Sequence, residues 1–296
     1  MRIDHGLSLT PVSHNRAAPP ERGERQAVKA PEELKKVAES FVSARRGAGS
    51  LVEYPGAMPD SMAEAYAIQD RAITLFGGTV GGWKVGRIWP PMSERFGAER
   101  LAGPIFTGQM LSPGEDGLIF AAGFGAAEAE YLLRIGATPE PGKTSFTLEE
   151  AVDLIDAVHI GIEIASSPFV GINEHGPAVT VSDFGNNNGL IVGPEVADWR
   201  NADIDDVEIT SRIDGEVINT AKSSGFPDGV VGSARFLIEN MVGRGIAIQP
   251  GWWISTGAIT GVHPVKVGQR FEADFGAFGT LACTIAAQPA ITAAAE

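Results

Sequence analysis

The chain of 296 residues is acidic, with 23 Lys and Arg against 37 Asp and Glu and a net charge of −14. This charge argues against nucleic acid and against an anionic membrane surface as partners. Apolar residues make up 44% of the chain and charged residues 20%, which is ordinary for a globular protein, and no apolar run approaches the length of a membrane span. The length suits one large domain, or one domain with an appendage.

The first segment, residues 1–28, is polar and contains Pro, and we predict that it forms a mobile tail. It lacks the apolar core of a secretory signal. The single cysteine, Cys283, excludes an internal disulfide and agrees with a reducing compartment, so we expect a cytoplasmic protein. The apolar residues around Cys283 predict a buried strand in which the thiol acts as a small hydrophobic group.

Residues 29–100 are expected to form a helical segment that leads into a strand of the active site. Apolar residues at helical spacing predict one amphipathic helix at 31–48 and a second at 60–76. A polar residue, Asp60 or Ser61, can cap the second helix. The strand that follows is "GGWKVG", which is flanked by Gly on both sides.

Residues 101–290 show short apolar runs punctuated by Gly, Pro and Asn, which predicts a β-rich catalytic core. Two helices are expected within it, at 147–158 and 233–245, and "AVTVSDFGNNNGLIVGPEV" (178–196) is among the segments predicted as strand. Asp214–Gly215 is the expected turn of a hairpin. Helices first and strands afterwards favour an α+β fold over a regular βαβ alternation.

Two glutamates, Glu128 and Glu130, stand two residues apart in the otherwise small and apolar stretch "GAAEAEYLLRIG". Alternate residues of a strand face the same side, so the two carboxylates would repel each other unless a positive charge lay between them. Glu163 is a lone carboxylate in another apolar run, "HIGIEIASS", where burial without a partner is costly. Three such ligands suit Mg²⁺, Mn²⁺ or Ca²⁺. A solvated strand face, with Glu163 in a salt bridge, is the alternative.

Three further features are candidates for a site. Lys84 lies between paired glycines, where it can transfer a proton or pair with a carboxylate, or it is a surface lysine. The turn "STGAITG" (255–261) offers hydroxyl and backbone N–H groups to an anion, or is an ordinary turn. The segment "SDFGNNNG" (182–189), which includes Asp183, is either a turn or a polar pocket wall.

Seven segments form an ordered set between about residue 31 and residue 288: "AYAIQDRAI", "GGWKVG", "PPMSERFG", "AAEAEYLLRIG", "AVHIGIEIASSPF", "NNNGLIVG" and "IAIQPGWWISTGAITGVHPVKVGQ". In this order they resemble the group of 2-keto-4-pentenoate hydratases and 4-oxalocrotonate decarboxylases, within the fumarylacetoacetate hydrolase superfamily. The resemblance implies an α+β fold, a mixed β-roll or sandwich like the C-terminal domain of fumarylacetoacetate hydrolase, with N-terminal helices. It also implies a homo-oligomer that acts on a small 2-oxo or 2-hydroxy carboxylic acid.

The resemblance further implies a role for each candidate residue. Glu128, Glu130 and Glu163 match the carboxylates that hold Mg²⁺ or Mn²⁺, and Lys84 matches an active-site lysine, which we predict to be catalytic. Thr256 and Gly257 match the turn that holds the substrate carboxylate. The predicted substrate-binding residues are Arg87, Asp183, Thr256 and Gly257.

The implied reaction is the addition of water to a 2-hydroxy-2,4-dienoic acid through a metal-stabilised enolate, which gives a 4-hydroxy-2-oxo acid in the meta-cleavage degradation of aromatic compounds. The chain departs from the hydratases at "RIW" (87–89) and at "LAGPIFTGQM" (101–110), which lacks an acidic residue expected there. Arg87 could hold a second carboxylate, so the alternative is a decarboxylase of a 4-oxalocrotonate-type 2-oxo diacid. A catalytically silent partner subunit and an acylpyruvate hydrolase are further alternatives. The absence of His between residues 15 and 158 counts against the hydrolase.

Overall fold

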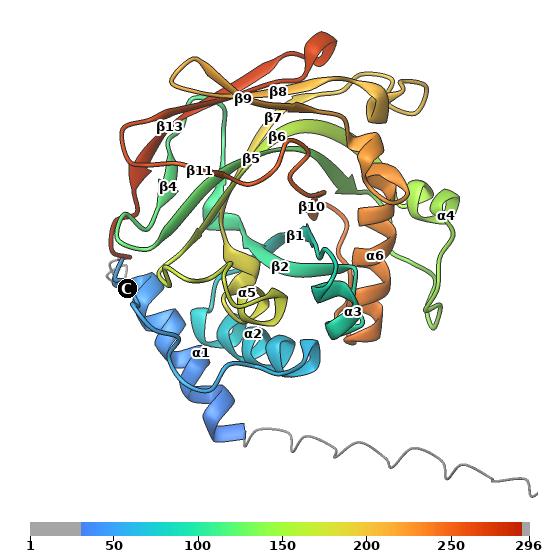
Figure 1. Cartoon of the computed structure of the whole chain (residues 1–296). Coiled ribbons are helices and arrows are strands. Elements are labelled where there is room, and N and C mark those ends of the chain that lie inside the picture. Colours follow the sequence, from blue (N-terminus) through green and yellow to red (C-terminus); the bar gives the residue numbers. More distant parts are fainter. Residues whose placement is uncertain (1–30, 292–296) are drawn as a thin grey trace, which may run out of the picture.

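Two β-sheets form the body of the protein, with helices at one end and along one side (Figure 1). The computed structural model describes residues 31–291, so the tail predicted at 1–28 lies outside the described residues. The larger sheet has the strand order β2-β1-β10-β5-β6-β7-β3, with β11 paired to β5, and the smaller sheet has the order β4-β13-β12-β8-β9.

The strands of the larger sheet are β1 (Val80–Arg87), β2 (Arg100–Phe106), β3 (Met110–Leu111), β5 (Phe124–Ile135), β6 (Ile155–Ser167), β7 (Asn187–Glu195), β10 (Trp253–Ser255) and β11 (His263–Pro264). Those of the smaller sheet are β4 (Gly117–Ile119), β8 (Ile209–Ile213), β9 (Glu216–Ala221), β12 (Arg270–Asp274) and β13 (Thr280–Ala287). The α-helices of the described residues are α1 (Pro31–Arg46), α2 (Met62–Phe76), α3 (Met92–Phe96), α4 (Leu148–Asp153), α5 (Pro177–Ser182) and α6 (Gly229–Gly243).

The two predicted N-terminal helices are confirmed as α1 and α2, which pack against each other below the larger sheet in Figure 1. Helix α2 begins after Ser61, whose side chain accepts a hydrogen bond from the backbone N–H of Glu64, and it ends at Gly77 in the left-handed region with a φ of 70°. The N-cap is therefore Ser61 rather than Asp60. None of the helices within residues 31–291 is long and apolar enough to cross a membrane.

Two predictions of local structure are wrong. The helix expected at 147–158 ends at Asp153, because the chain from Ile155 onward pairs with β5 as strand β6. The first apolar run of the segment 178–196, which was expected as a strand, is helix α5, which starts with Pro177 and is buried on all sides, and the strand β7 begins only at Asn187. A short apolar run without a polar face has no period, so its pattern does not separate helix from strand.

The long strands β5 and β6 pair antiparallel near the centre of the larger sheet. The smaller sheet packs on one face of this pair: the Tyr131 ring of β5 lies 5.4 Å, centroid to centroid, from the ring of Phe275, which follows β12. Side chains alternate along a strand, so Glu128 and Glu130 face away from the smaller sheet. On that other side the larger sheet curves, and Lys84 of β1 approaches Glu163 of β6.

The predicted helical segment and the predicted β-rich core contribute to the same sheet. Strand β1 lies in the first and pairs antiparallel with β2, where Lys84 is opposite Gly103 and Arg87 is opposite Arg100. The predicted α+β organisation is confirmed by the helices and the two mixed sheets. The predicted hairpin turn at Asp214–Gly215 is also confirmed, and it joins β8 to β9.

Gly103 allows a close approach between β2 and the chain at Phe184. A Cβ atom at residue 103 would lie 2.1 Å from the Phe184 carbonyl oxygen, which is backbone and therefore cannot move alone. We expect Gly103→Ala to lower the free energy of unfolding by about 1–3 kcal/mol or more, measured by chemical denaturation. Gly108→Ala, where nothing lies within 4 Å of the new Cβ, is the control. Equal midpoints for the two variants would contradict the close approach.

Candidate active site

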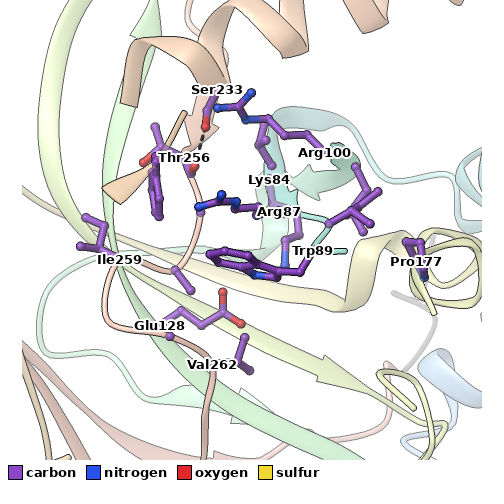
Figure 2. A pocket seen from close by; sticks show the side chains of 18 of the residues that line it. Lys84, Arg87, Trp89, Arg100, Glu128, Pro177, Ser233, Thr256, Ile259 and Val262 are labelled. Atoms are coloured by element: carbon purple, nitrogen blue, oxygen red, sulfur yellow. Dashed lines mark hydrogen bonds between the residues drawn. The ribbon is translucent and has the colours of Figure 1, made fainter. Parts of the chain in front are cut away.

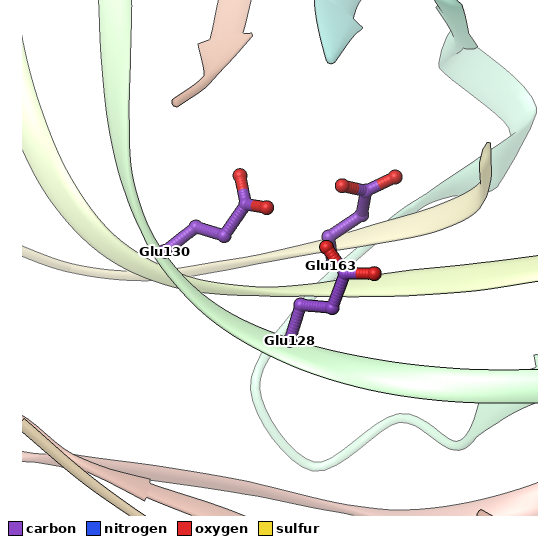
Figure 3. A group of neighbouring side chains, drawn as sticks. All are labelled: Glu128, Glu130 and Glu163. Atoms are coloured by element: carbon purple, nitrogen blue, oxygen red, sulfur yellow. The ribbon is translucent and has the colours of Figure 1, made fainter. Parts of the chain in front are cut away.

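Three glutamates meet on the face of β5 and β6 that points away from the smaller sheet (Figure 3). Glu128 is directly opposite Glu163 in the strand pairing, and Glu130 lies two residues further along β5. One carboxylate oxygen from each lies within 4.8 Å of the others. The exposed fractions of Glu128, Glu130 and Glu163 are 3%, 0% and 0%. The structure thus brings the three predicted carboxylates together in a buried place.

One oxygen of Glu130 is held by the turn that follows β10. The Ser255 hydroxyl and the Gly257 backbone N–H, at 2.9 Å, both donate to Glu130 Oε2. The other oxygen, Oε1, is buried and has no hydrogen-bond partner in the structure. A buried polar atom without a partner is costly, so this oxygen points to a ligand that completes the site.

Glu163 has the same division between its two oxygens. Its Oε1 accepts a hydrogen bond from Asn187 Nδ2 at 2.9 Å and lies 3.2 Å from Lys84 Nζ. Its Oε2 is buried and has no hydrogen-bond partner in the part of the chain that the structure describes. The Lys84 ammonium, in a residue that is 4% exposed, also donates to Asn186 Oδ1 at 3.0 Å. Lys84 is therefore a buried cation beside the carboxylates and not a surface lysine.

Burial shifts the ionisation of these groups. It raises the pKa of Glu128 to about 7, although the charge of Lys84 opposes the shift. Burial, together with the neighbouring charges of Glu163 and Glu128, raises the pKa of Glu130 well above its usual range. Burial alone would lower the pKa of Lys84, but the three carboxylates outweigh it and the net shift is upward. Lys84 is accordingly protonated at neutral pH.

The residues fit a hard divalent cation. Three carboxylates share this volume with one ammonium, so ionisation of all three leaves negative charge that no described side chain compensates. Two of their oxygens have no partner. Carboxylate oxygens are the ligands that Mg²⁺, Mn²⁺ and Ca²⁺ prefer.

A cavity of about 800 Å³ opens over Lys84 and Glu128 (Figure 2). Among residues 31–291, Glu128 is the one acidic side chain in its lining, and no histidine lines it. The basic residues in the lining are Lys84, Arg87, Arg100 and Lys222. Apolar side chains complete the walls, among them Ile88, Trp89, Leu101 and Phe226. The cavity is therefore positively charged at its walls in a chain whose net charge is −14.

Two arginines stand across from each other on β1 and β2 in this lining. The Arg87 guanidinium carbon lies 3.6 Å from the centroid of the Trp89 ring, and Nη1 donates to the carbonyl oxygen of Gly225 at 3.0 Å. Arg100 is 8% exposed and donates to the Pro227 carbonyl oxygen. Within the described residues, neither arginine has a carboxylate within 4.0 Å. Both guanidinium groups retain donors for an anion.

Three of the four predicted substrate-binding residues line the cavity, namely Arg87, Thr256 and Gly257. The Thr256 hydroxyl donates to the Tyr131 carbonyl oxygen at 2.9 Å. Its proton is therefore already used within the protein, although Thr256 lines the cavity.

The fourth residue, Asp183, is not part of the cavity lining. It is 1% exposed, and its carboxylate is bound by the Arg45 guanidinium and by the Ser167 hydroxyl. The prediction that Asp183 binds substrate is therefore not supported by its position. Its oxygens are already engaged in the protein interior.

Sequence reasoning missed Arg100. It named the segments that contain Ser255, Asn186 and Asn187 but not the separate contacts that these residues make with the glutamates and Lys84. The triple Asn between apolar residues was the available signal for the two asparagines, since buried amides need partners. Arg100 carried no signal, because only the pairing of β1 with β2 places it opposite Arg87.

Solved structures share this fold. The 4-oxalocrotonate decarboxylase from Pseudomonas putida G7, complexed with magnesium and adipate, has a TM-score of 0.73 and 20% identity, over 87% of this chain and 98% of that chain. The fumarylpyruvate hydrolase from Pseudomonas aeruginosa, in complex with Mn²⁺ and pyruvate, has a TM-score of 0.51 and 15% identity, over 69% and 88%. The 5-carboxymethyl-2-hydroxymuconate delta-isomerase from Mycobacterium smegmatis has a TM-score of 0.53 and 17% identity, over 70% and 80%. No protein-family model and no curated protein matches the sequence.

At these identities the likeness shows a common fold, and the predicted fold class is confirmed. The group indicated by the ordered motifs includes 4-oxalocrotonate decarboxylase, and the structure of that enzyme shares this fold.

The raised pKa of Glu130 makes stability depend on pH. The pKa of the Glu130 carboxyl is higher in the folded chain than its ordinary value of 4.5, which applies to the unfolded chain. As the pH rises above 4.5, the unfolded chain loses this proton first, so the folded state becomes less stable. Without divalent cations, we expect Glu130→Gln to become more stable relative to the wild type as the pH rises above 4.5, measured by thermal unfolding in EDTA. The exposed Glu216→Gln serves as the control and should show no such trend. A constant difference between Glu130→Gln and wild type would contradict the assignment.

Proposed function

We propose that Mg²⁺ or Mn²⁺ binds Glu128, Glu130 and Glu163, and that the protein is a metal-dependent decarboxylase of an unsaturated 2-oxo diacid of the 4-oxalocrotonate type. The observation that carries this proposal is the cavity itself. Lys84 and Glu128 line it, and Glu130 and Glu163 lie buried beside Glu128. Two arginines without an ion-paired carboxylate also line it, and Glu128 is the one acid in the described lining. The complexes of structural neighbours with magnesium, calcium and Mn²⁺ support the cation.

A bound divalent cation would supply Lewis acidity, which polarises the C2 carbonyl of a 2-oxo acid and stabilises negative charge on that oxygen. The substrate loses CO₂ when the bond to the distal carboxylate breaks, and the electron pair passes through the C3–C4 double bond to the C2 oxygen. Lys84 is protonated beside this site, so it stabilises the dienolate and donates the proton that converts the C2 oxygen to the hydroxyl of the 2-hydroxydienoate. Lys84 then recovers a proton from solvent.

Arg87 and Arg100 are the proposed partners of the second carboxylate. They are cross-strand neighbours on β1 and β2, and the charge of a diacid matches their unused donors. The nearby apolar side chains, such as Leu101, reduce the hydration of a carboxylate that is to leave as neutral CO₂.

Hydration of a 2-hydroxy-2,4-dienoic acid is the second candidate. It uses the same dienolate chemistry, and the amides of Asn173 and Asn186, which are hydrogen-bonded to each other at 3.1 Å in the cavity wall, offer groups that orient a water molecule. Hydration also requires a base to activate that water. Glu128 is the one acid in the described lining and is already assigned to the cation, so the geometry favours decarboxylation.

Other expectations stay predictions. The buried triad and Lys84 argue against a catalytically silent subunit, because both are complete. The homo-oligomeric state and the cytoplasmic location are proposed from the resemblance and from the single cysteine, respectively.

The direct test is incubation of the purified protein with 2-oxohex-3-enedioate and Mg²⁺, followed by ultraviolet absorbance and CO₂ release. We expect 2-hydroxypenta-2,4-dienoate and CO₂ in equal amounts, and no reaction in EDTA. We expect Lys84→Met to lower kcat by about 10²–10⁴-fold, because the proton donor is lost. Conversion of 2-hydroxypenta-2,4-dienoate to 4-hydroxy-2-oxopentanoate, with no CO₂ from the diacid, would instead establish the hydratase. Unchanged Mn²⁺ affinity in Glu163→Ala would contradict the metal site.

The arginine pair predicts how substrates are distinguished. We expect Arg100→Met to raise KM for the diacid by about 10–100-fold with a smaller effect on kcat, because a charge-assisted hydrogen bond to the distal carboxylate is lost. Lys222→Met is the matched control, because Lys222 also lines the cavity but is half-exposed and paired with Asp206 at 2.8 Å. Equal effects of the two substitutions on steady-state kinetics would argue against a specific carboxylate contact at Arg100.

A further inference from the structure

The chain takes an unusual backbone conformation immediately before β7. Phe184, Gly185 and Asn186 all lie in the left-handed region, with φ values of 55°, 62° and 58°. This region is unfavourable for a bulky aromatic residue, and a strained residue costs on the order of 1–3 kcal/mol. Such a turn persists only where its surroundings hold it in place. We call residues 183–187 the left-handed turn.

Arg45 of helix α1 is the main contact that holds the left-handed turn. Its Nε and Nη2 both bind the Asp183 carboxylate, the second at 3.0 Å, and Nη1 donates to the Asn187 carbonyl oxygen at 3.0 Å. Nη2 also donates to the Ser166 carbonyl oxygen of β6 at 3.2 Å. The guanidinium carbon lies 4.9 Å from the centroid of the Phe184 ring.

These contacts depend on the shape of the guanidinium group. Arg45 is 2% exposed, and its planar set of donors reaches one carboxylate and three separate backbone carbonyls at once. A lysine would keep the charge but has one nitrogen, which cannot make the same set of contacts. Because Arg45 and Asp183 are both buried, removal of either charge leaves the other without compensation.

The opposite side of the left-handed turn faces the candidate active site. Asn186 Oδ1 accepts the hydrogen bond from Lys84 Nζ at 3.0 Å, and Asn187 Nδ2 donates to Glu163 Oε1 at 2.9 Å. The two asparagines are adjacent, and each contacts a different charged group of the site. A shift of the turn would therefore displace both contacts together.

We propose that Arg45 is a positioning residue for the cation site. It acts through the left-handed turn: its contacts with Asp183 and with the Asn187 carbonyl fix the Asn187 amide, which orients the Glu163 carboxylate for a cation. The inference rests on the proposed function, since it concerns the same three carboxylates. The inference goes beyond the proposed function because Arg45 belongs to helix α1 and is not part of the cavity lining. Loss of such a supporting contact typically weakens metal binding by about 10–100-fold.

The test is the Mn²⁺ affinity of the full chain, measured by electron paramagnetic resonance titration without substrate. We expect Asn187→Ala and Arg45→Met each to raise the Kd for Mn²⁺ by about 10–100-fold, and the double variant to be no weaker than the weaker single variant. Arg45→Lys, which retains the buried charge, is expected to give an intermediate increase and provides a folded variant if Arg45→Met does not fold.

The control for a general weakening of α1 is Val37→Ala. Val37 is buried in the same helix, but its apolar side chain cannot hydrogen-bond to Asp183 or Asn187, so the expected result is a lower melting temperature with unchanged Mn²⁺ affinity. Wild-type Kd values in folded Arg45→Lys and Asn187→Ala would overturn the proposal and leave the proposed function intact. Absence of Mn²⁺ binding to the wild type would overturn the proposed function itself.

Discussion

The structure depends on an imbalance of buried charge. Three carboxylates from β5 and β6 are buried beside the ammonium of Lys84, and two carboxylate oxygens have no hydrogen-bond partner among residues 31–291. Isolated burial of such groups is strongly unfavourable. Hydrogen bonds from the surrounding chain reduce the free-energy cost of this burial. The turn after β10 donates to Glu130, and Asn187 and Asn186 contact Glu163 and Lys84 respectively. The negative charge that remains suits a divalent cation.

The parts of the site that could be predicted lie close together in the sequence or follow a simple period. Glu128 and Glu130 share a strand face because side chains alternate, and Glu163 joins them because β5 and β6 are consecutive strands that pair with Glu163 opposite Glu128. Helices α1 and α2 follow their amphipathic pattern for the same local reason. The overall α+β arrangement was accessible from the order of these elements.

The parts that could not be predicted require long-range partners. Asp183 has the same polar, Gly- and Asn-rich neighbours whether it faces a pocket or the interior, and only its pairing with Arg45, 138 residues away, decides between them. Arg100 becomes a neighbour of Arg87 through the register of β1 and β2. Helix α5 was mistaken for strand because burial on all sides removes its period. In each case tertiary packing supplies what the local pattern lacks.

Helix α1 is the first helix of the described residues, and its burial and hydrogen bonds decide how well a change in it is tolerated. Arg45 lies in the last turn of α1 and binds the left-handed turn through Asp183. The two segments are far apart in the sequence, but each depends on the other for its buried ion pair. A change that removes the charge of Arg45 leaves the buried Asp183 carboxylate without its partner unless Asp183 changes as well. Among homologous chains these two positions are therefore expected to vary together, and recombination between residues 46 and 183 would join halves that do not fit.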